Sequence, residues 1–214
     1  MLRALIFDFD GLIVDTETSA IDAWACLHEE DNVPFRRAHM HAIIGHADTP
    51  HDPWIHYAAD VSRAALETRY RRAAREMTLA APVLPGVRKL IDTARAAGLR
   101  LAVASNSSHA HVDHHLAHRG LLALFDHVAC RDDVAHGKPE PDVYLAALRG
   151  LGVDASETIA FEDSVPGHEA AYRAGLRVVV APNPSTAHFK FPHAAWQVPS
   201  LADVSLPALQ ARFA

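Results

Sequence analysis

Short apolar runs that end in polar residues recur along the chain. Residues 2–7 run into Asp8-Phe9-Asp10-Gly11, and residues 99–104 run into Ser105-Asn106-Ser107. The same pattern recurs at residues 127–130, 158–161 and 176–181. Continuous apolar runs of this length are typical of buried parallel strands. We therefore predict five strands whose polar ends emerge at the edge of a parallel sheet.

Helical segments alternate with these strands, and a glycine closes each of them. The segments are residues 87–97, 109–119, 141–151 and 166–174. A glycine just after the last helical residue favours a helix end, because glycine adopts the left-handed conformation needed there. The alternation of strands and helices predicts an α/β fold, with a Rossmann-like parallel sheet covered on both faces.

Residues 16–81 interrupt the alternation. They are rich in Ala, Arg, His, Glu and Asp and contain no strand-like run. We predict several helices there, including residues 18–31 and 62–77. The chain therefore divides into a core, residues 1–15 and 82–214, and an all-helical domain, residues 16–81, inserted after the first strand.

Composition and charge limit the function classes. The 214 residues include 20 Lys and Arg against 26 Asp and Glu, a formal net charge of −6. This acidity argues against a broad nucleic-acid or membrane surface. No apolar run approaches the length of about eighteen residues that a membrane helix needs, and the first apolar run meets Asp8 too early for a signal peptide. Cys26 and Cys130 match no disulfide or metal spacing, which predicts a cytoplasmic protein.

The polar strand ends carry candidate chemistry. In an open parallel sheet, ligands bind beyond the carboxyl ends of the strands. The side chains expected there are Asp8, Asp10, Ser105, Asn106, Glu162 and Asp163. Clustered carboxylates repel one another unless a divalent cation lies among them, and hard oxygen ligands favour Mg²⁺. The alternative, that each polar pair only caps the following helix, would have to hold independently at three strand ends.

A lysine is the other candidate. Lys138 lies in Gly-Lys-Pro-Glu-Pro-Asp, and the chain holds only three lysines against 17 arginines. An ordinary solvated lysine would explain it in isolation. Together with the acidic strand ends, a compact cation on a stiffened loop indicates a group that faces a phosphate.

These four sets of residues, Asp8-Phe9-Asp10-Gly11, Ser105-Asn106, Lys138 and Glu162-Asp163-Ser164, resemble the ordered motifs of the haloacid dehalogenase-like hydrolases. The resemblance extends from residue 2 to about residue 183 and is greatest to the β-phosphoglucomutase-like and sugar-phosphatase branch. That branch carries a helical cap domain where this chain has residues 16–81.

The resemblance implies a role for each motif residue. Asp8 would be the nucleophile that forms an aspartyl-phosphate, and Asp10 the general acid and then base. The implied phosphate-binding residues are Gly11, Ser105, Asn106 and Lys138. The implied Mg²⁺ ligands are Asp8, the Asp10 carbonyl, Glu162 and Asp163. The implied enzyme is a phosphoric monoester hydrolase.

Elementary electrostatics supports these roles. Two unit charges about 4 Å apart interact by about 1 kcal/mol in water and about 4 kcal/mol at an effective dielectric near 20. A carboxylate therefore approaches a phosphate dianion only beside cations, which Mg²⁺ and Lys138 would provide. Asp10 lies two residues beyond Asp8, so that on an extended segment both side chains point the same way.

Other activities within the family fit less well. The related mutases carry a histidine ten residues after the second aspartate, where this chain has Ala20. They also carry a cap arginine just after a glycine, where this chain has Gly45-His46-Ala47-Asp48. Both departures favour water as the final phosphoryl acceptor. A phosphoglucomutase-like transfer and, in a different class, a non-catalytic phospho-aspartate switch remain the alternatives.

The sequence defines the substrate only as a small phosphorylated metabolite, a sugar or polyol phosphate. A polar and aromatic cluster in the insert is the candidate contact surface: His46, His51, Trp54, His56 and Tyr57. A solvated charged face explains Arg69, Arg71, Arg72 and Arg75. The oligomeric state stays open between monomer and dimer.

Five histidines lie close together in the segment 109–118: His109, His111, His114, His115 and His118. Pairs four residues apart on a helix could chelate zinc or nickel. A solvated helix face is the simpler interpretation, because no cysteine or acidic partner marks a catalytic metal there.

Overall fold

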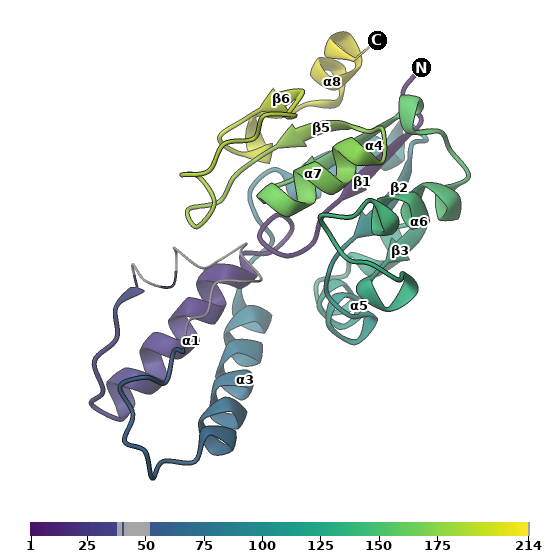
Figure 1. Cartoon of the computed structure of the whole chain (residues 1–214). Helices are drawn as coiled ribbons and strands as arrows, with labels where there is room; N and C mark the ends of the chain where they lie inside the picture. Colours follow the sequence, from purple (N-terminus) through teal and green to yellow (C-terminus); the bar gives the residue numbers. More distant parts are fainter. Residues whose placement is uncertain (38–39, 41–51, 214) are drawn as a thin grey trace. The chain divides into compact units, whose positions relative to one another are not determined.

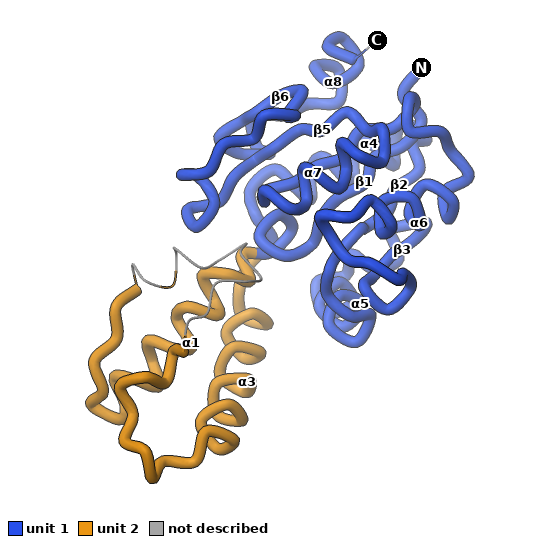
Figure 2. Tube along the Cα trace, viewed as in Figure 1, with its two compact units in different colours: residues 1–14, 83–214 blue, residues 15–82 orange. Residues whose placement is uncertain are grey.

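The computed structural model describes residues 1–37, 40 and 52–213 (Figure 1). The chain forms two compact units (Figure 2). Unit 1 comprises Met1–Val14 and Val83–Ala214, and unit 2 comprises Asp15–Pro82. These bounds lie one residue outside the predicted insert at each end.

Unit 1 is built on a six-stranded sheet in the order β3-β2-β1-β4-β5-β6, and every neighbouring pair is parallel. The strands are β1 Ala4–Phe7, β2 Arg100–Ala104, β3 His127–Ala129, β4 Thr158–Glu162, β5 Arg177–Val180 and β6 Trp196–Gln197. The predicted Rossmann-like α/β fold is confirmed. The strand order reverses between β1 and β4, which is where such sheets bind ligands.

Helices cover the sheet because both of its faces are apolar. The helices of unit 1 are α4 Val87–Ala96, α5 His109–His118, α6 Asp142–Leu151, α7 Val165–Arg173 and α8 Leu206–Arg212. Ala4 and Ile6 of β1 share a buried core cluster with side chains of α6 and α7. The neighbouring Phe7 points to the opposite face, where its ring stacks on Phe161 with centroids 4.8 Å apart.

Each of the predicted strands and helices of unit 1 is present, with ends shifted by one or two residues. The prediction missed β6 and α8. β6 has two residues and α8 has seven, so neither is long enough to show a hydrophobic period. Both are fixed by packing: β6 pairs with β5, and α8 contacts α4.

Two helices dominate the described part of unit 2. They are α1 Thr16–Glu30 and α3 Arg63–Ala80. Asp15 caps α1 by accepting a hydrogen bond from the Thr18 N–H at 2.9 Å, and Ser62 caps α3 in the same way. Side-chain oxygens at these positions satisfy N–H groups that have no partner within the helix.

Aromatic residues form the core of unit 2. Trp54 is only 6% exposed and packs with Leu27 and Leu66, and Tyr57 packs against the same cluster. The ring of Trp24 stacks on Tyr70 with centroids 4.3 Å apart. The interpretation of Trp54 as a candidate sugar contact is therefore wrong, because its side chain packs in the core of unit 2. His46, His51 and the segment 45–48 lie outside the described residues.

Arginines on α3 form ion pairs on the surface of unit 2. Arg69 contacts Glu30 and Asp31, Arg71 contacts Glu67, and Arg72 contacts Glu76. The prediction of a charged helix face is confirmed for these three residues. In the described part of the chain, no helix combines the length and apolar character needed to cross a bilayer.

Candidate active site

The site lies at the carboxyl ends of two adjacent central strands. β1 ends at Phe7, so that Asp8 is the first residue beyond it, and its N–H donates to the Phe161 carbonyl at 3.0 Å. Glu162 is the last residue of β4, and Asp163 follows it. Because β1 pairs with β4 in register, segments more than 150 residues apart bring their acids together.

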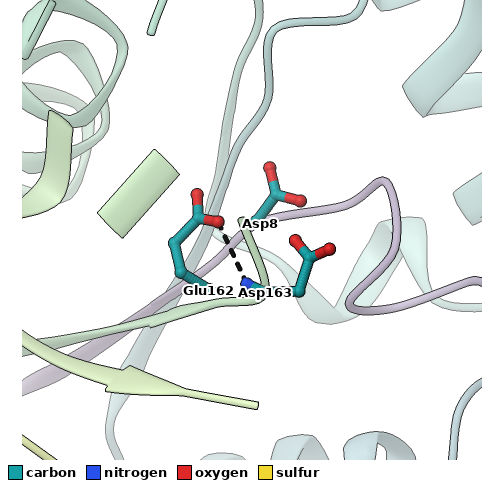
Figure 3. Close-up of side chains that lie close together, drawn as sticks. All are labelled: Asp8, Glu162 and Asp163. Carbon is teal, nitrogen blue, oxygen red and sulfur yellow. Dashed lines mark hydrogen bonds between the residues drawn. The ribbon is translucent and has the colours of Figure 1, made fainter. Parts of the chain in front are cut away.

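Three carboxylates converge on one point. Asp8, Glu162 and Asp163 are 5%, 0% and 0% exposed. Each offers an oxygen, and these oxygens lie within 4.8 Å of one another. Figure 3 shows the three side chains gathered around a shared space, with the Asp163 N–H donating back to Glu162 at 3.1 Å.

Lys138 extends into this cluster from the loop before α6. Its Nζ lies 2.5 Å from Asp8 Oδ1 and 2.6 Å from Glu162 Oε1, and its side chain is 4% exposed. The side chain of Asn106 holds the backbone of this loop, because its Oδ1 accepts from the Lys138 N–H at 2.7 Å and its Nδ2 donates to the Lys138 carbonyl. The structure thus joins the second and third predicted motifs.

The electrostatics of the cluster favours a further cation. Burial raises the pKa of Asp8 well above its usual value, since the repulsion from Glu162 and Asp10 adds to it and Lys138 only partly offsets both. Burial would lower the pKa of Lys138, but attraction to Asp8 and Glu162 outweighs it and raises that pKa. One lysine faces three carboxylates. Hard oxygen donors with an excess of negative charge fit a divalent cation such as Mg²⁺.

Two glycines leave room for the acids. Gly11 has a φ of +82°, and a Cβ there would lie 2.4 Å from Asp163 Oδ2. A Cβ on Gly167 would lie 2.1 Å from the carboxyl group of Glu162. Positive φ is accessible to glycine at little cost, so that Gly11 permits the tight turn after Asp10 and the close approach of Asp163.

Asp10 points toward a different set of partners. Its Oδ2 accepts hydrogen bonds from Ser105 Oγ at 3.2 Å and from Ser107 Oγ at 2.6 Å, and its Oδ1 lies 3.0 Å from His111 Nε2. The structure therefore brings Ser105 to Asp10. The candidate metal group defined by side-chain oxygens in the described residues does not include the Asp10 carboxylate.

Four residues that contact the site were not predicted to belong to it. Tyr144 donates from its hydroxyl to Glu162 Oε1 at 2.6 Å, and Asn183 donates from Nδ2 to Asp163 Oδ2 at 2.8 Å. Ser107 and His111 contact Asp10 as described above. Asn183 and Ser107 follow strand ends, a signal that could have marked them. Tyr144 lies on an amphipathic helix, where its pattern is that of an ordinary core residue.

The histidine-rich helix α5 only partly matches its predicted role. His114 and His118 are exposed, which agrees with a solvated face. His115 is 2% exposed, and burial followed by repulsion from His111 lowers its pKa to about 4. The solvated-face interpretation is therefore wrong for His115, because this side of α5 faces the interior of unit 1.

Unit 1 is a parallel α/β sheet with buried carboxylates at its central strand ends and Lys138 beside them. This arrangement indicates a hydrolase. A family model described as haloacid dehalogenase-like hydrolase matches residues 2–175. The chain belongs to this family, as its motifs indicated. The predicted enzyme class, a phosphoric monoester hydrolase, is confirmed by the family and by relatives named phosphatases.

Similar proteins share nearly the whole chain. Protein CbbY of Rhodobacter capsulatus is 35% identical over 227 residues, covering 97% of this chain and 97% of that protein. The phosphorylated carbohydrates phosphatase of Thermotoga maritima is 30% identical over 179 residues, 82% of each. A crystal structure of CbbY from Rhodobacter sphaeroides in complex with xylulose-(1,5)bisphosphate aligns with a TM-score of 0.77 and 31% identity, covering 98% of this chain and 99% of that one.

Proposed function

We propose that this protein is a magnesium-dependent phosphatase that hydrolyses a small phosphomonoester through an aspartyl-phosphate on Asp8. The observation that carries the proposal is the buried contact of Asp8 with Lys138 inside a cluster that holds more negative than positive charge. Such a carboxylate is arranged to accept a phosphoryl group, because the surrounding cations attract the phosphate that it must attack.

The reaction proceeds in two displacements. A carboxylate oxygen of Asp8 bonds to phosphorus while the bond from phosphorus to the ester oxygen breaks, and Asp10 donates a proton to that oxygen. Asp10 then takes a proton from a water molecule, whose oxygen attacks phosphorus and releases inorganic phosphate from Asp8. A bound Mg²⁺ supplies positive charge that stabilises the phosphoryl oxygens.

The remaining residues bind and orient. Lys138 neutralises the phosphoryl group. The Ser105 hydroxyl, which donates to Asp10 in the structure, would turn to donate to the phosphoryl group, while Ser107 keeps its hydrogen bond to Asp10. Asn106 keeps Lys138 in place through the loop backbone, and Gly11 leaves space beside Asp163. Asp8, Glu162, Asp163 and the Asp10 carbonyl would hold the metal ion. Because all these groups recognise phosphate and not the attached alcohol, they leave the choice of substrate to other residues.

We propose that residues 16–81 act as the cap domain that selects the alcohol. Support comes from the position of the insert, directly after β1 and Asp10, and from its separate hydrophobic core. The substrate class is a sugar or polyol phosphate. The relatives support this class: one is named a phosphatase of phosphorylated carbohydrates, and another was crystallised with a sugar bisphosphate.

A panel of phosphate esters tests this function. Purified protein with Mg²⁺ should release inorganic phosphate from p-nitrophenyl phosphate and from at least one sugar or polyol phosphate, including the pentulose bisphosphate bound by the relative. Glucose 1-phosphate, incubated in parallel with a trace of glucose 1,6-bisphosphate, tests the mutase alternative. Conversion to glucose 6-phosphate without release of inorganic phosphate would favour a mutase. The absence of turnover on every ester would favour a phospho-aspartate switch.

Replacing Asp163 with asparagine should raise the Mg²⁺ concentration required for half-maximal activity by about tenfold or more, because loss of even a hydrogen-bonding partner of a metal ligand typically costs about 10–100-fold in metal affinity. The amide keeps the size of the side chain but removes one negative charge from the cluster. Titration of activity with Mg²⁺ measures this effect. Asp203→Asn, on the exposed surface of unit 1, is the matched control, and an equal Mg²⁺ requirement in both variants would exclude Asp163 as a ligand.

A further inference from the structure

One face of α5 points toward the proposed general acid. His111, His115 and Arg119 follow one another at intervals of four residues, which places them on the same side of the helix. His111 Nε2 lies 3.0 Å from Asp10 Oδ1, within hydrogen-bond distance. A carboxyl oxygen that carries no proton only accepts hydrogen bonds, so Nε2 is the donor to Oδ1, and the proton that Asp10 transfers would be carried on Oδ2.

The ring of His111 is held in position from two sides. It packs edge-on against Phe9, with ring centroids 5.6 Å apart. Phe9 is fully buried and lies between Asp8 and Asp10 in the sequence. Behind it lies the buried ring of His115, with a centroid distance of 4.5 Å. Arg119 in turn donates to His115 Nδ1 at 3.3 Å and to its carbonyl at 3.1 Å.

We propose that His111 is a positioning residue that orients the Asp10 carboxylate for proton transfer to the leaving group. Ser105 and Ser107 donate to Oδ2 of this carboxylate, and His111 donates to Oδ1. Donors on both oxygens fix the rotation of the carboxyl group. This inference rests on the proposed function, because it assumes that Asp10 is the general acid.

The residues that support this role of His111 all lie in unit 1. Asp10, both serines and α5 all belong to that unit, so the contact of His111 with Asp10 is made within one unit. The effect of His111 should therefore appear with simple aryl phosphates, which carry no sugar for a cap domain to recognise. General acid catalysis contributes about 10²–10⁴ in rate, and misplacement of the acid forfeits part of that factor.

The leaving group provides the test. Phenyl phosphate releases a basic phenolate, which needs a proton as the bond breaks, whereas p-nitrophenyl phosphate releases a stabilised nitrophenolate that needs little help. For His111→Phe, which keeps a packed ring but removes the donor, we expect kcat/KM for phenyl phosphate to fall about tenfold or more. For p-nitrophenyl phosphate we expect a fall of less than about threefold. kcat/KM is used because it reports only the steps up to cleavage of the ester bond.

Three further variants show whether the loss of activity in His111→Phe results from a misplaced Asp10. Asp10→Asn should lower kcat/KM in the same selective way and by more. His111→Gln, which retains a side-chain N–H donor, should recover most of the lost activity on phenyl phosphate. His118→Phe changes an exposed histidine of the same helix and should leave both esters unaffected. If His111→Phe does not fold, as judged by circular dichroism, His111→Leu is compared with His111→Gln instead.

Each outcome decides the matter. An equal fall on both esters would reveal a structural role only, and a rise on phenyl phosphate would mean that His111 holds Asp10 away from the substrate; either result overturns the inference while the phosphatase assignment stands. If the wild-type protein with Mg²⁺ present hydrolyses neither these esters nor any sugar or polyol phosphate, the proposed function fails and the inference falls with it.

Discussion

Asp8→Asn should reduce the turnover of every phosphate ester by at least about a thousandfold, because a neutral amide oxygen cannot replace the carboxylate as nucleophile. The fold should survive. Asparagine has nearly the same shape, and the substitution removes one of three buried carboxylates that repel one another. The variant should therefore keep the thermal midpoint of the wild type or exceed it in the absence of Mg²⁺.

Release of p-nitrophenol and of inorganic phosphate measures the loss. Asp203→Asn applies the same substitution at an exposed position of unit 1 and should retain full activity. A folded Asp8→Asn variant that keeps more than a trace of activity would remove Asp8 as the nucleophile and, with it, the aspartyl-phosphate.

Lys138→Met should have the second largest effect, on both activity and stability. The side chain of Lys138 is buried between Asp8 and Glu162, so its removal leaves two carboxylates facing each other without a cation. Breaking a buried ion pair from one side costs about 3–5 kcal/mol. Turnover should fall by about a hundredfold or more, because the positive charge that faces the phosphate is lost.

The stability loss should depend on pH with a definite sign. Burial and repulsion already raise the pKa of Asp8 in the folded protein, and loss of Lys138 raises it further. A carboxyl group with a raised pKa prefers to be protonated in the fold, so that folding is penalised once the unfolded chain ionises. The free energy of unfolding of the variant, relative to wild type, should therefore decrease as pH rises from about 5 to about 8.

Thermal or urea unfolding without metal measures this pH dependence. Lys89→Met, on the exposed side of α4, is the control and should show no comparable change. Equal stability of the two variants, or a penalty that shrinks as pH rises, would contradict the idea that Lys138 balances the buried carboxylates.

The central part of the fold was accessible from the sequence because each element carries its own signal. The runs before Asp8 and Ser105 are apolar except for Arg3 and Arg100 near their starts, as expected for strands covered on both faces. Glycines close the helices that follow. Once the sheet is known to be parallel, the polar residues after each strand must share one edge, and this is why Asp8, Ser105 and Glu162 could be grouped without coordinates.

The weaker elements and the supporting residues required the structure. β6 and α8 exist through contacts with β5 and α4, which leave no periodic pattern in so few residues. Trp54 was interpreted as a ligand contact, but it fills the core of unit 2. An aromatic residue near polar ones gives no local sign of whether it faces solvent or a neighbouring helix.

Helix α5 shows which features follow from the sequence and which follow only from the tertiary structure. The sequence by itself predicted a helix over residues 109–119 with histidines around much of its circumference, and two aspartates after the first strand. Only the tertiary structure decided that His111 contacts Asp10, that His115 is buried and that His118 is exposed. Local sequence sets the helical period, whereas the rotation of the helix about its axis is set by packing against segments that are remote in the chain.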